Sequence, residues 1–150
     1  MELEVIKVIY KGIDYYAMFE NEESTLYHEN HKFIVFTDKK KLLAYFSNQN
    51  VIDKNFIINF DDTNLNNPID YKDILEKWNL FMGISSIKNM HFEGNEKEYT
   101  STYNYLFCCY TSIEPLPEKY RIPNIYVIRI RKVFKKAKRE IERFIFDIAN

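Results

Sequence analysis

The chain has 150 residues, 46% of them apolar and 17% aromatic, which is enough for one core and argues against disorder. Only three glycines and four prolines are present, which disfavours glycine-rich phosphate loops and β-sandwiches with many turns. The formal charge of −1 is uneven: residues 129–150 hold eight basic and three acidic groups, and residues 1–128 hold 13 basic and 19 acidic groups. We expect a single domain over residues 1–150 with an acidic body and a basic carboxy-terminal segment.

The cysteines and the amino-terminal segment favour a cytoplasmic location. Cys108 and Cys109 are the two cysteines, and adjacent cysteines rarely form a disulfide, so a reducing compartment fits best. The first residues, MELEVIKVIYKGID, carry two acids and lack the features of a secretory signal. The longest apolar runs fall far short of the roughly 20 residues that span a bilayer. We therefore expect no membrane partner.

In the amino-terminal half, β-branched and aromatic residues dominate four short segments, which predicts strands. These segments are residues 3–10, 15–20, 32–37 and 56–60. The first two flank the turn KGID and predict a β-hairpin. Asp38 is the expected N-cap of a helix that ends near Asn48. Its expected apolar side consists of Leu42, Leu43, Tyr45 and Phe46.

In the carboxy-terminal half, Asp70 is the expected N-cap of a second helix over residues 71–84. Residues 99–112 are balanced between strand and helix, and their Thr, Tyr and Phe content favours strand. Residues 115–123 contain three prolines and predict an irregular connector. Beyond them, apolar residues at three- and four-residue steps predict a long amphipathic helix. Those residues are Ile130, Val133, Phe134, Ala137, Ile141, Phe144, Ile145 and Ile148.

The start of this last helix is open, because IYVIRIR just before it alternates with a period of two and also fits a strand. The predicted fold class is α+β. We expect a mainly antiparallel sheet, built from the amino-terminal hairpin and further strands. Two or three helices pack with it, including the long carboxy-terminal one.

The sequence contains no recognisable catalytic, metal or cofactor constellation. His28 and His31 lie three residues apart, but a zinc site needs three or four ligands at a suitable spacing. The flanks of Cys108 are apolar and uncharged, which favours packed thiols over a nucleophile. We expect no enzymatic activity, no metal and no cofactor, and hence a protein that binds a macromolecule.

Two sets of charged residues are candidate binding sites. The first set is acidic and lies in predicted loops, where it would complement a basic partner: Glu20, Glu22, Glu23, Asp61, Asp62, Glu93, Glu96 and Glu98. The second set is basic and would contact phosphates: Lys132, Lys135, Lys136 and Arg139. A solvated helix face explains the second set equally well, and the acidic body repels polyanions. Nucleic acid is therefore the disfavoured partner, in a small regulatory protein.

The hairpin KGIDYYAMFEN and the later strand and helix HKFIVFTDKKKLLAYFS resemble bacterial immunity proteins of contact-dependent growth-inhibition toxins. The likeness covers the first third of the chain. The resemblance implies a non-enzymatic antidote that binds a cognate toxin domain in the cytoplasm and blocks its active site or a nearby surface. Many such toxins are nucleases. The resemblance transfers no individual functional residue, so the acidic candidates rest on charge alone.

Overall fold

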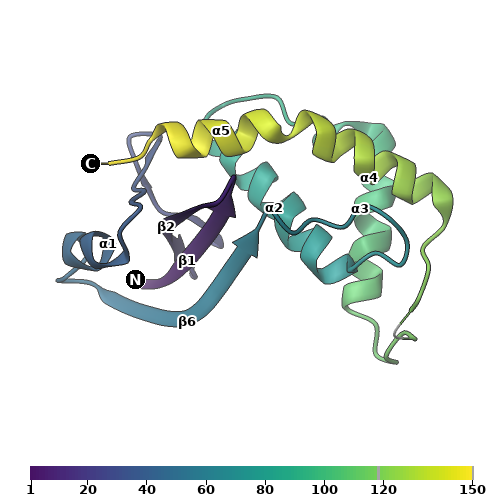
Figure 1. Ribbon diagram of the computed structural model, residues 1–150, viewed down its shortest axis with the longest axis horizontal. Helices are drawn as coiled ribbons and strands as arrows, with labels where there is room; N and C mark the ends of the chain where they lie inside the picture. The colour runs from purple at the N-terminus through teal and green to yellow at the C-terminus, as the bar shows by residue number, and fades with distance from the viewer. Residues whose placement is uncertain (118, 150) are drawn as a thin grey trace.

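The computed structural model describes residues 1–117 and 119–149 and has an α+β fold (Figure 1). A four-stranded mixed sheet has the order β3-β2-β1-β6, and β4 pairs with β5 in a second, small sheet. The strands are β1 (Glu2–Tyr10), β2 (Ile13–Glu20), β3 (Thr25–Leu26), β4 (His28–Glu29), β5 (Lys32–Phe33) and β6 (Asn50–Asn59). The helices are α1 (Lys39–Tyr45), α2 (Tyr71–Ile87), α3 (Lys97–Tyr110), α4 (Asn124–Lys136) and α5 (Lys138–Phe146), with a short 3-10 helix η1 (Glu93–Asn95).

The predicted amino-terminal hairpin is confirmed, and its turn is two residues long. Tyr10 pairs with Ile13, which leaves Lys11 and Gly12 as the turn, both with positive φ (49° and 75°). Two-residue turns of this kind match the right-handed twist of the flanking strands. Glycine adopts the second position without a steric penalty because it has no Cβ.

The sheet is mixed because β6 runs parallel to β1, whereas β1–β2 and β2–β3 are antiparallel. The strand predicted at residues 56–60 is part of β6, which begins earlier, at Asn50. Asn55 has a positive φ, and the register between β1 and β6 shifts at the same place. This irregularity interrupts the alternation of apolar residues, which explains why sequence pattern alone identified only the second half of the strand.

The two faces of the sheet carry separate apolar clusters, because successive side chains of a strand point to opposite faces. α1 covers one face, and the cluster beneath it consists of Leu3, Val5, Met18, Phe36, Leu42 and Phe46. The other face, with Ile6 and Val8, belongs to the larger cluster that α2, α4 and α5 complete. In Figure 1, α1 and α2 accordingly lie on opposite sides of the strands.

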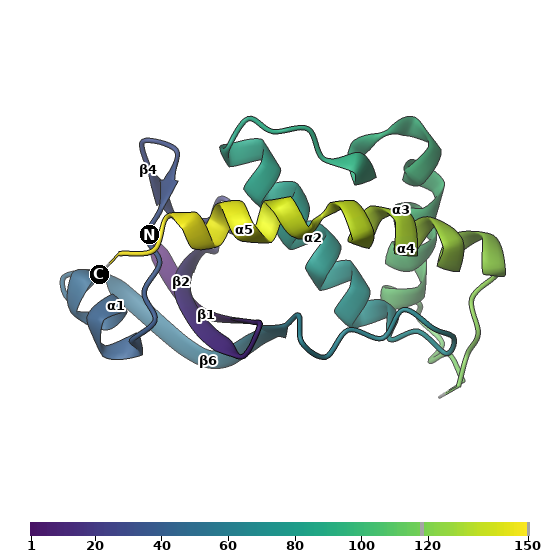
Figure 2. The same ribbon diagram turned by 45° about the horizontal axis from the view of Figure 1, so that its top comes forward.

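The carboxy-terminal helix is confirmed as an amphipathic packing helix, and it bends at Ala137 between α4 and α5. Figure 2 shows α4 and α5 running in succession across α2. Of the predicted stripe, Ile130, Val133, Phe134, Ala137, Ile141 and Phe144 are buried, whereas Ile145 and Ile148 are only partly buried. The end of the helix is held by a buried ion pair between Asp147 and Lys88, and Asp147 Oδ2 also accepts a hydrogen bond from the Phe33 amide at 2.9 Å.

The preference for strand at residues 99–112 was wrong, because α3 occupies most of this segment. Its buried residues are Tyr99, Thr102, Leu106 and Cys109, at steps of three and four, which is the helical period. Aromatic residues outside this buried stripe, including the exposed Phe107 and Tyr110, obscured the pattern. The strand alternative for IYVIRIR was also wrong, since α4 begins at Asn124 and includes it.

The strand expected at residues 32–37 is largely absent. Only Lys32–Phe33 forms a strand, in the small sheet, and Val35 and Phe36 make single bridges to Ile148 and Tyr16. Ala149 donates its amide to Val35 O at 2.7 Å, so the carboxy-terminal end of the chain uses a backbone group that a sheet neighbour would otherwise pair with. Sequence pattern cannot foresee a partner so distant in the chain.

Asp38 is the N-cap of α1 as predicted, with its side chain accepting from the Lys40 amide. α1 ends at Tyr45, three residues before the expected Asn48. Its expected apolar side was partly wrong. Leu42 and Phe46 are buried, whereas Leu43 and Tyr45 are 38% and 49% exposed. Asp70 is likewise the N-cap of α2, accepting from the Asp73 amide. Along residues 1–117 and 119–149, no helix combines the length and apolar character needed to cross a membrane.

Candidate partner-binding groove

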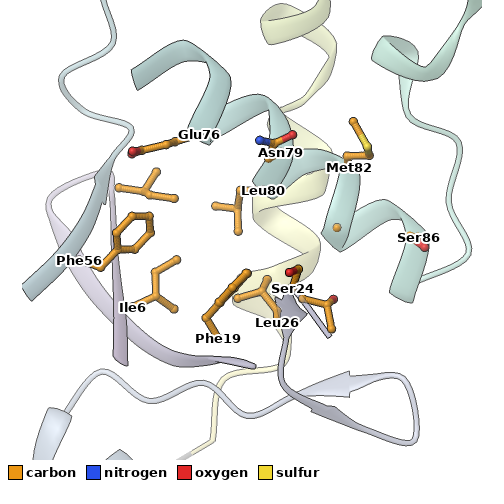
Figure 3. A pocket seen from close by; sticks show the side chains of 13 residues that line it. Ile6, Phe19, Ser24, Leu26, Phe56, Glu76, Asn79, Leu80, Met82 and Ser86 are labelled. Carbon is orange, nitrogen blue, oxygen red and sulfur yellow. The ribbon is translucent and has the colours of Figure 1, made fainter. Parts of the chain in front are cut away.

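A groove of about 580 Å³ lies between the mixed sheet and α2 (Figure 3). Its floor is apolar and receives side chains from all the strands of the mixed sheet: Ile6, Phe19, Leu26, Phe56 and Ile58. Phe19 and Phe56 are only partly buried, so their rings are accessible from the groove. The volume falls in the range of roughly 300–1,000 Å³ that is typical of binding pockets.

The groove stays open because the largest side chains of α2 point elsewhere. Trp78 packs against Phe92 with ring centroids 6.1 Å apart, and Phe81 packs against Phe134 at 5.1 Å. The side of α2 that faces the sheet carries Gly83 towards its carboxy-terminal end. A Cβ at Gly83 would meet no atom within 4 Å, so this position borders open space.

Glu76 is the acidic group of the groove. Figure 3 places its carboxylate on α2 above Phe56. Burial is the main cause that raises the pKa of Glu76; the charges of Lys72 and Lys77 act against this rise, and the carboxylates of Asp73 and Asp70 add to it. The neighbouring Lys77 is fully buried and donates instead to Asp73 and to the Thr63 hydroxyl, the latter at 2.9 Å. Within residues 1–117 and 119–149, no group donates a hydrogen bond to the Glu76 carboxylate.

The first predicted acidic group lies beside this groove. Glu22 and Glu23 are exposed in the turn after β2, and Ser24, the next residue, lines the groove. Glu20 alternates with Phe19 on β2, so it points to the α1 face of the sheet. Glu22 and Glu23 are therefore close in the chain to the end of the groove that Ser24 lines, which is opposite the end with Glu76.

The second predicted acidic group lies at the other end of the hairpin. Asp61 accepts hydrogen bonds from the amides of Lys11 and Gly12 at 2.7 and 2.8 Å, so its carboxylate stabilises the β1–β2 turn. Asp62 is exposed, and its backbone carbonyl accepts from Lys77 at 3.1 Å. The fold does not bring this pair to the groove.

The third predicted acidic group belongs to the helical part of the molecule. Glu93 pairs with Lys136 at 3.1 Å, and Glu96 pairs with His91 at 3.1 Å. Glu98 is exposed in the first turn of α3. The ligand-type atoms of His91, Glu93 and Glu96 lie within 4.8 Å of one another, although no pattern in the sequence indicated this cluster. Since Glu93 already contacts Lys136 and Glu96 already contacts His91, we assign no metal site to them.

The predicted phosphate-binding residues are spread over α4 and the start of α5. Lys132 and Lys135 are exposed on α4. Lys136 is engaged by Glu93, and Arg139 donates to the backbone oxygen of His91 at 2.7 Å and to the Glu140 carboxylate at 3.3 Å. Half of this set therefore joins the helix to the η1 segment.

Backbone contacts account for the two histidines His28 and His31, and burial accounts for one of the two cysteines. Nδ1 of His28 and Nδ1 of His31 lie 3.1 Å from the carbonyl oxygens of Leu26 and Ile87, respectively. Cys109 is buried, and burial raises the pKa of its thiol, whereas Cys108 is exposed on α3. The expectation of two packed thiols was therefore right for Cys109 and wrong for Cys108, because adjacent helical residues point in different directions.

Comparison of the chain with protein-family models, with curated proteins and with solved structures found no match. The fold and the groove define an α+β protein with an open apolar groove that carries one carboxylate, that of Glu76. Sequence reasoning missed Phe19, Phe56 and Glu76 as groove residues. An isolated glycine at position 83, inside a helical pattern, was the one local indication of open space beside α2.

Proposed function

We propose that the protein is an immunity protein that binds a cognate toxin domain in the cytoplasm and neutralises it by covering its active site or an adjoining surface. The observation that carries this proposal is the groove, which combines an apolar floor with the carboxylate of Glu76, while Glu22 and Glu23 are exposed in the turn that leads to Ser24. Protein interfaces draw most of their affinity from a few side chains that enter such depressions, and their rims are polar.

Binding is favoured over catalysis by the chemistry of the groove. Of the described residues that line it, Glu76 alone is titratable. General acid–base and nucleophilic catalysis need an acid, a base or a nucleophile converging on one substrate atom. A single carboxylate beside aromatic and aliphatic walls instead suits the recognition of a cation with an apolar stem.

A nuclease is the proposed class of toxin. Enzymes that bind nucleic acid present basic surfaces to the phosphates, and the carboxylates of Glu76, Glu22 and Glu23 would complement such a surface. Complementary charge accelerates association and selects the correct partner, which is what an antidote to an intracellular toxin requires. The groove then supplies apolar contact area that charge alone does not provide.

The test is protection of cells from the toxin domain that, on this proposal, the neighbouring reading frame encodes. Wild-type protein is expected to restore growth and to bind the purified toxin domain. The double variant Glu22→Lys/Glu23→Lys is expected to weaken binding about tenfold or more, because it places like charges against a basic partner. The matched control is Lys132→Glu/Lys135→Glu, which reverses two exposed cations away from the groove and is expected to bind like wild type.

Two results would contradict the proposal. One is a wild-type protein that neither protects cells nor binds the toxin domain. The other is loss of function in Lys132→Glu/Lys135→Glu with full function in Glu22→Lys/Glu23→Lys. That pattern, together with a gel shift that weakens steeply with salt, would instead assign the function to nucleic-acid binding by α4.

A further inference from the structure

The groove is elongated and runs along α2. Its lining on α2 extends from Glu76 to Ser86, and ten residues of helix rise about 15 Å. On the opposite wall it crosses from Phe56 on β6 to Thr25 on β3, three strand spacings or about 14 Å. The α2 wall and the sheet wall therefore give nearly the same length for the groove, about 14–15 Å. An extended chain advances about 3.3 Å per residue, so four or five residues span the groove.

The volume agrees with a segment rather than a single side chain. At about 580 Å³ the groove holds several side chains and is open along its side. At its middle, Ile6, Phe19 and Leu80 form apolar walls (Figure 3). Gly83 on α2 leaves further space in the lining. The middle of the occupant must therefore be apolar.

The two ends of the groove differ in chemistry from the middle. At one end, Glu76 offers a carboxylate that no described group satisfies, and Asn79 lies beside it on α2. At the other end, Ser24 and Ser86 contribute hydroxyl groups, and Glu23 precedes Ser24. A half-buried carboxylate without a partner is costly, and a cationic side chain from a partner removes this cost.

We propose that the groove binds a short segment of the partner protein, four or five residues long, apolar in its middle and with an arginine or lysine that reaches Glu76. This inference rests on the proposed function for the identity of the partner, but it concerns the mode of binding. The aliphatic stem of the basic side chain packs on Phe56, and its charged end meets the Glu76 carboxylate.

The experiment uses peptide probes and the intact protein. Acetyl-Leu-Arg-Leu-Leu-amide is titrated into isotope-labelled protein, and backbone amide shifts are followed by NMR. The control peptide carries citrulline, which has the shape of arginine without its charge. We expect the arginine peptide to shift the amides of residues 19–26, 56–58 and 76–86, and the citrulline peptide to bind about five- to tenfold more weakly.

Two variants assign the effect to the groove. Glu76→Gln is expected to bind both peptides equally, at the affinity of the citrulline peptide, because the charged partner is gone. Gly83→Leu fills the centre of the groove and is expected to weaken both peptides about tenfold or more. Gly83→Ala adds only one methyl group to open space and is expected to weaken both peptides much less than Gly83→Leu does. The Glu76→Gln comparison remains decisive even where Gly83→Leu folds poorly.

Equal binding of the arginine and citrulline peptides to wild-type protein would overturn the inference, as would shifts confined to other surfaces or no shift at about 10 mM peptide. The toxin assay separates this failure from failure of the proposed function. Full protection by Gly83→Leu and Glu76→Gln would leave an immunity protein that binds its toxin elsewhere. Absence of protection by the wild type, with selective peptide binding, would leave a groove of this specificity in a protein of another function.

Discussion

The two faces of the mixed sheet carry similar apolar residues, but one face is covered by α1 and the other is left partly open beside α2. On one face, α1 lies over Leu3 and Met18, both fully buried, and the cluster there is closed. On the other face, α2 packs its largest side chains against the rest of the helical layer and leaves a groove over Phe19 and Phe56. The closed face stabilises the fold, and the open face is available to a partner.

The open face also separates the carboxylates that are available to a partner protein from those that are already paired. Asp61, Glu93 and Glu96 carry carboxylates, as Glu76 does, but each of the three has a partner within the molecule. Glu76 has none among the described residues and lies in a depression. Charge beside open apolar surface, rather than charge alone, therefore marks the candidate binding site.

The largest expected effect compares one truncation on each face. Leu42→Ala removes the fully buried side chain by which α1 packs on the sheet, and it is expected to lower the free energy of unfolding by about 2–5 kcal/mol. Phe19→Ala removes a ring that already borders the groove and is expected to cost less than about 2 kcal/mol. Urea denaturation measures both. Equal losses would mean that Phe19 is part of a packed core and that the two faces do not differ.

The second effect is a pH dependence on the closed face. Tyr27 packs edge-on against Phe46 with ring centroids 5.0 Å apart, and its hydroxyl donates to Glu29 at 2.9 Å. Burial, followed by this hydrogen bond, raises the pKa of Tyr27 to about 12. The neutral phenol is thus favoured in the folded state, so its stabilisation is complete below the ordinary pKa of about 10 and is lost as pH rises towards 12.

Tyr27→Phe is therefore expected to lose less stability than wild type between about pH 9 and pH 11.5 in urea denaturation. The exposed Tyr110 supplies the control, because Tyr110→Phe is expected to retain the wild-type slope. An unchanged slope in Tyr27→Phe would show that the Tyr27 hydroxyl does not contribute to closure of this face.

The smallest expected effect concerns the open face. Gly83→Ala is expected to raise the free energy of unfolding by about 0.5–1 kcal/mol, because alanine is the better helix former and its methyl group meets no atom within 4 Å. The change is read from the denaturation midpoint. A loss of stability would indicate that side chains close over Gly83 in solution and that the groove is narrower than described.

Local patterns in the sequence predicted the elements whose determinants are local. The hairpin around Gly12, the N-caps Asp38 and Asp70 and the apolar stripe of the carboxy-terminal helix all depend on residues close in the chain. The segment 32–37 and α3 were mispredicted. The first is paired by Ala149 and Asp147 from the far end of the chain, and the second carries aromatic residues on its exposed side.

The groove was beyond sequence reasoning because it exists only through tertiary packing. Phe19 and Phe56 resemble any strand aromatic residue until α2 is placed over them with Gly83 towards the gap. The charge argument selected Glu22 and Glu23, but it also selected Asp61 and Glu93. Asp61 accepts from the amides of Lys11 and Gly12, and Glu93 pairs with Lys136. These partners are far away in the sequence, so only the fold reveals them.

Hydrogen exchange of the protein, alone and bound to the toxin domain, tests the central claim most directly. The account predicts that binding slows exchange in residues 19–26, 56–58 and 76–86, the segments that border the groove, and leaves residues 129–139 unchanged. Protection confined to residues 129–139, with free exchange around the groove, would contradict it.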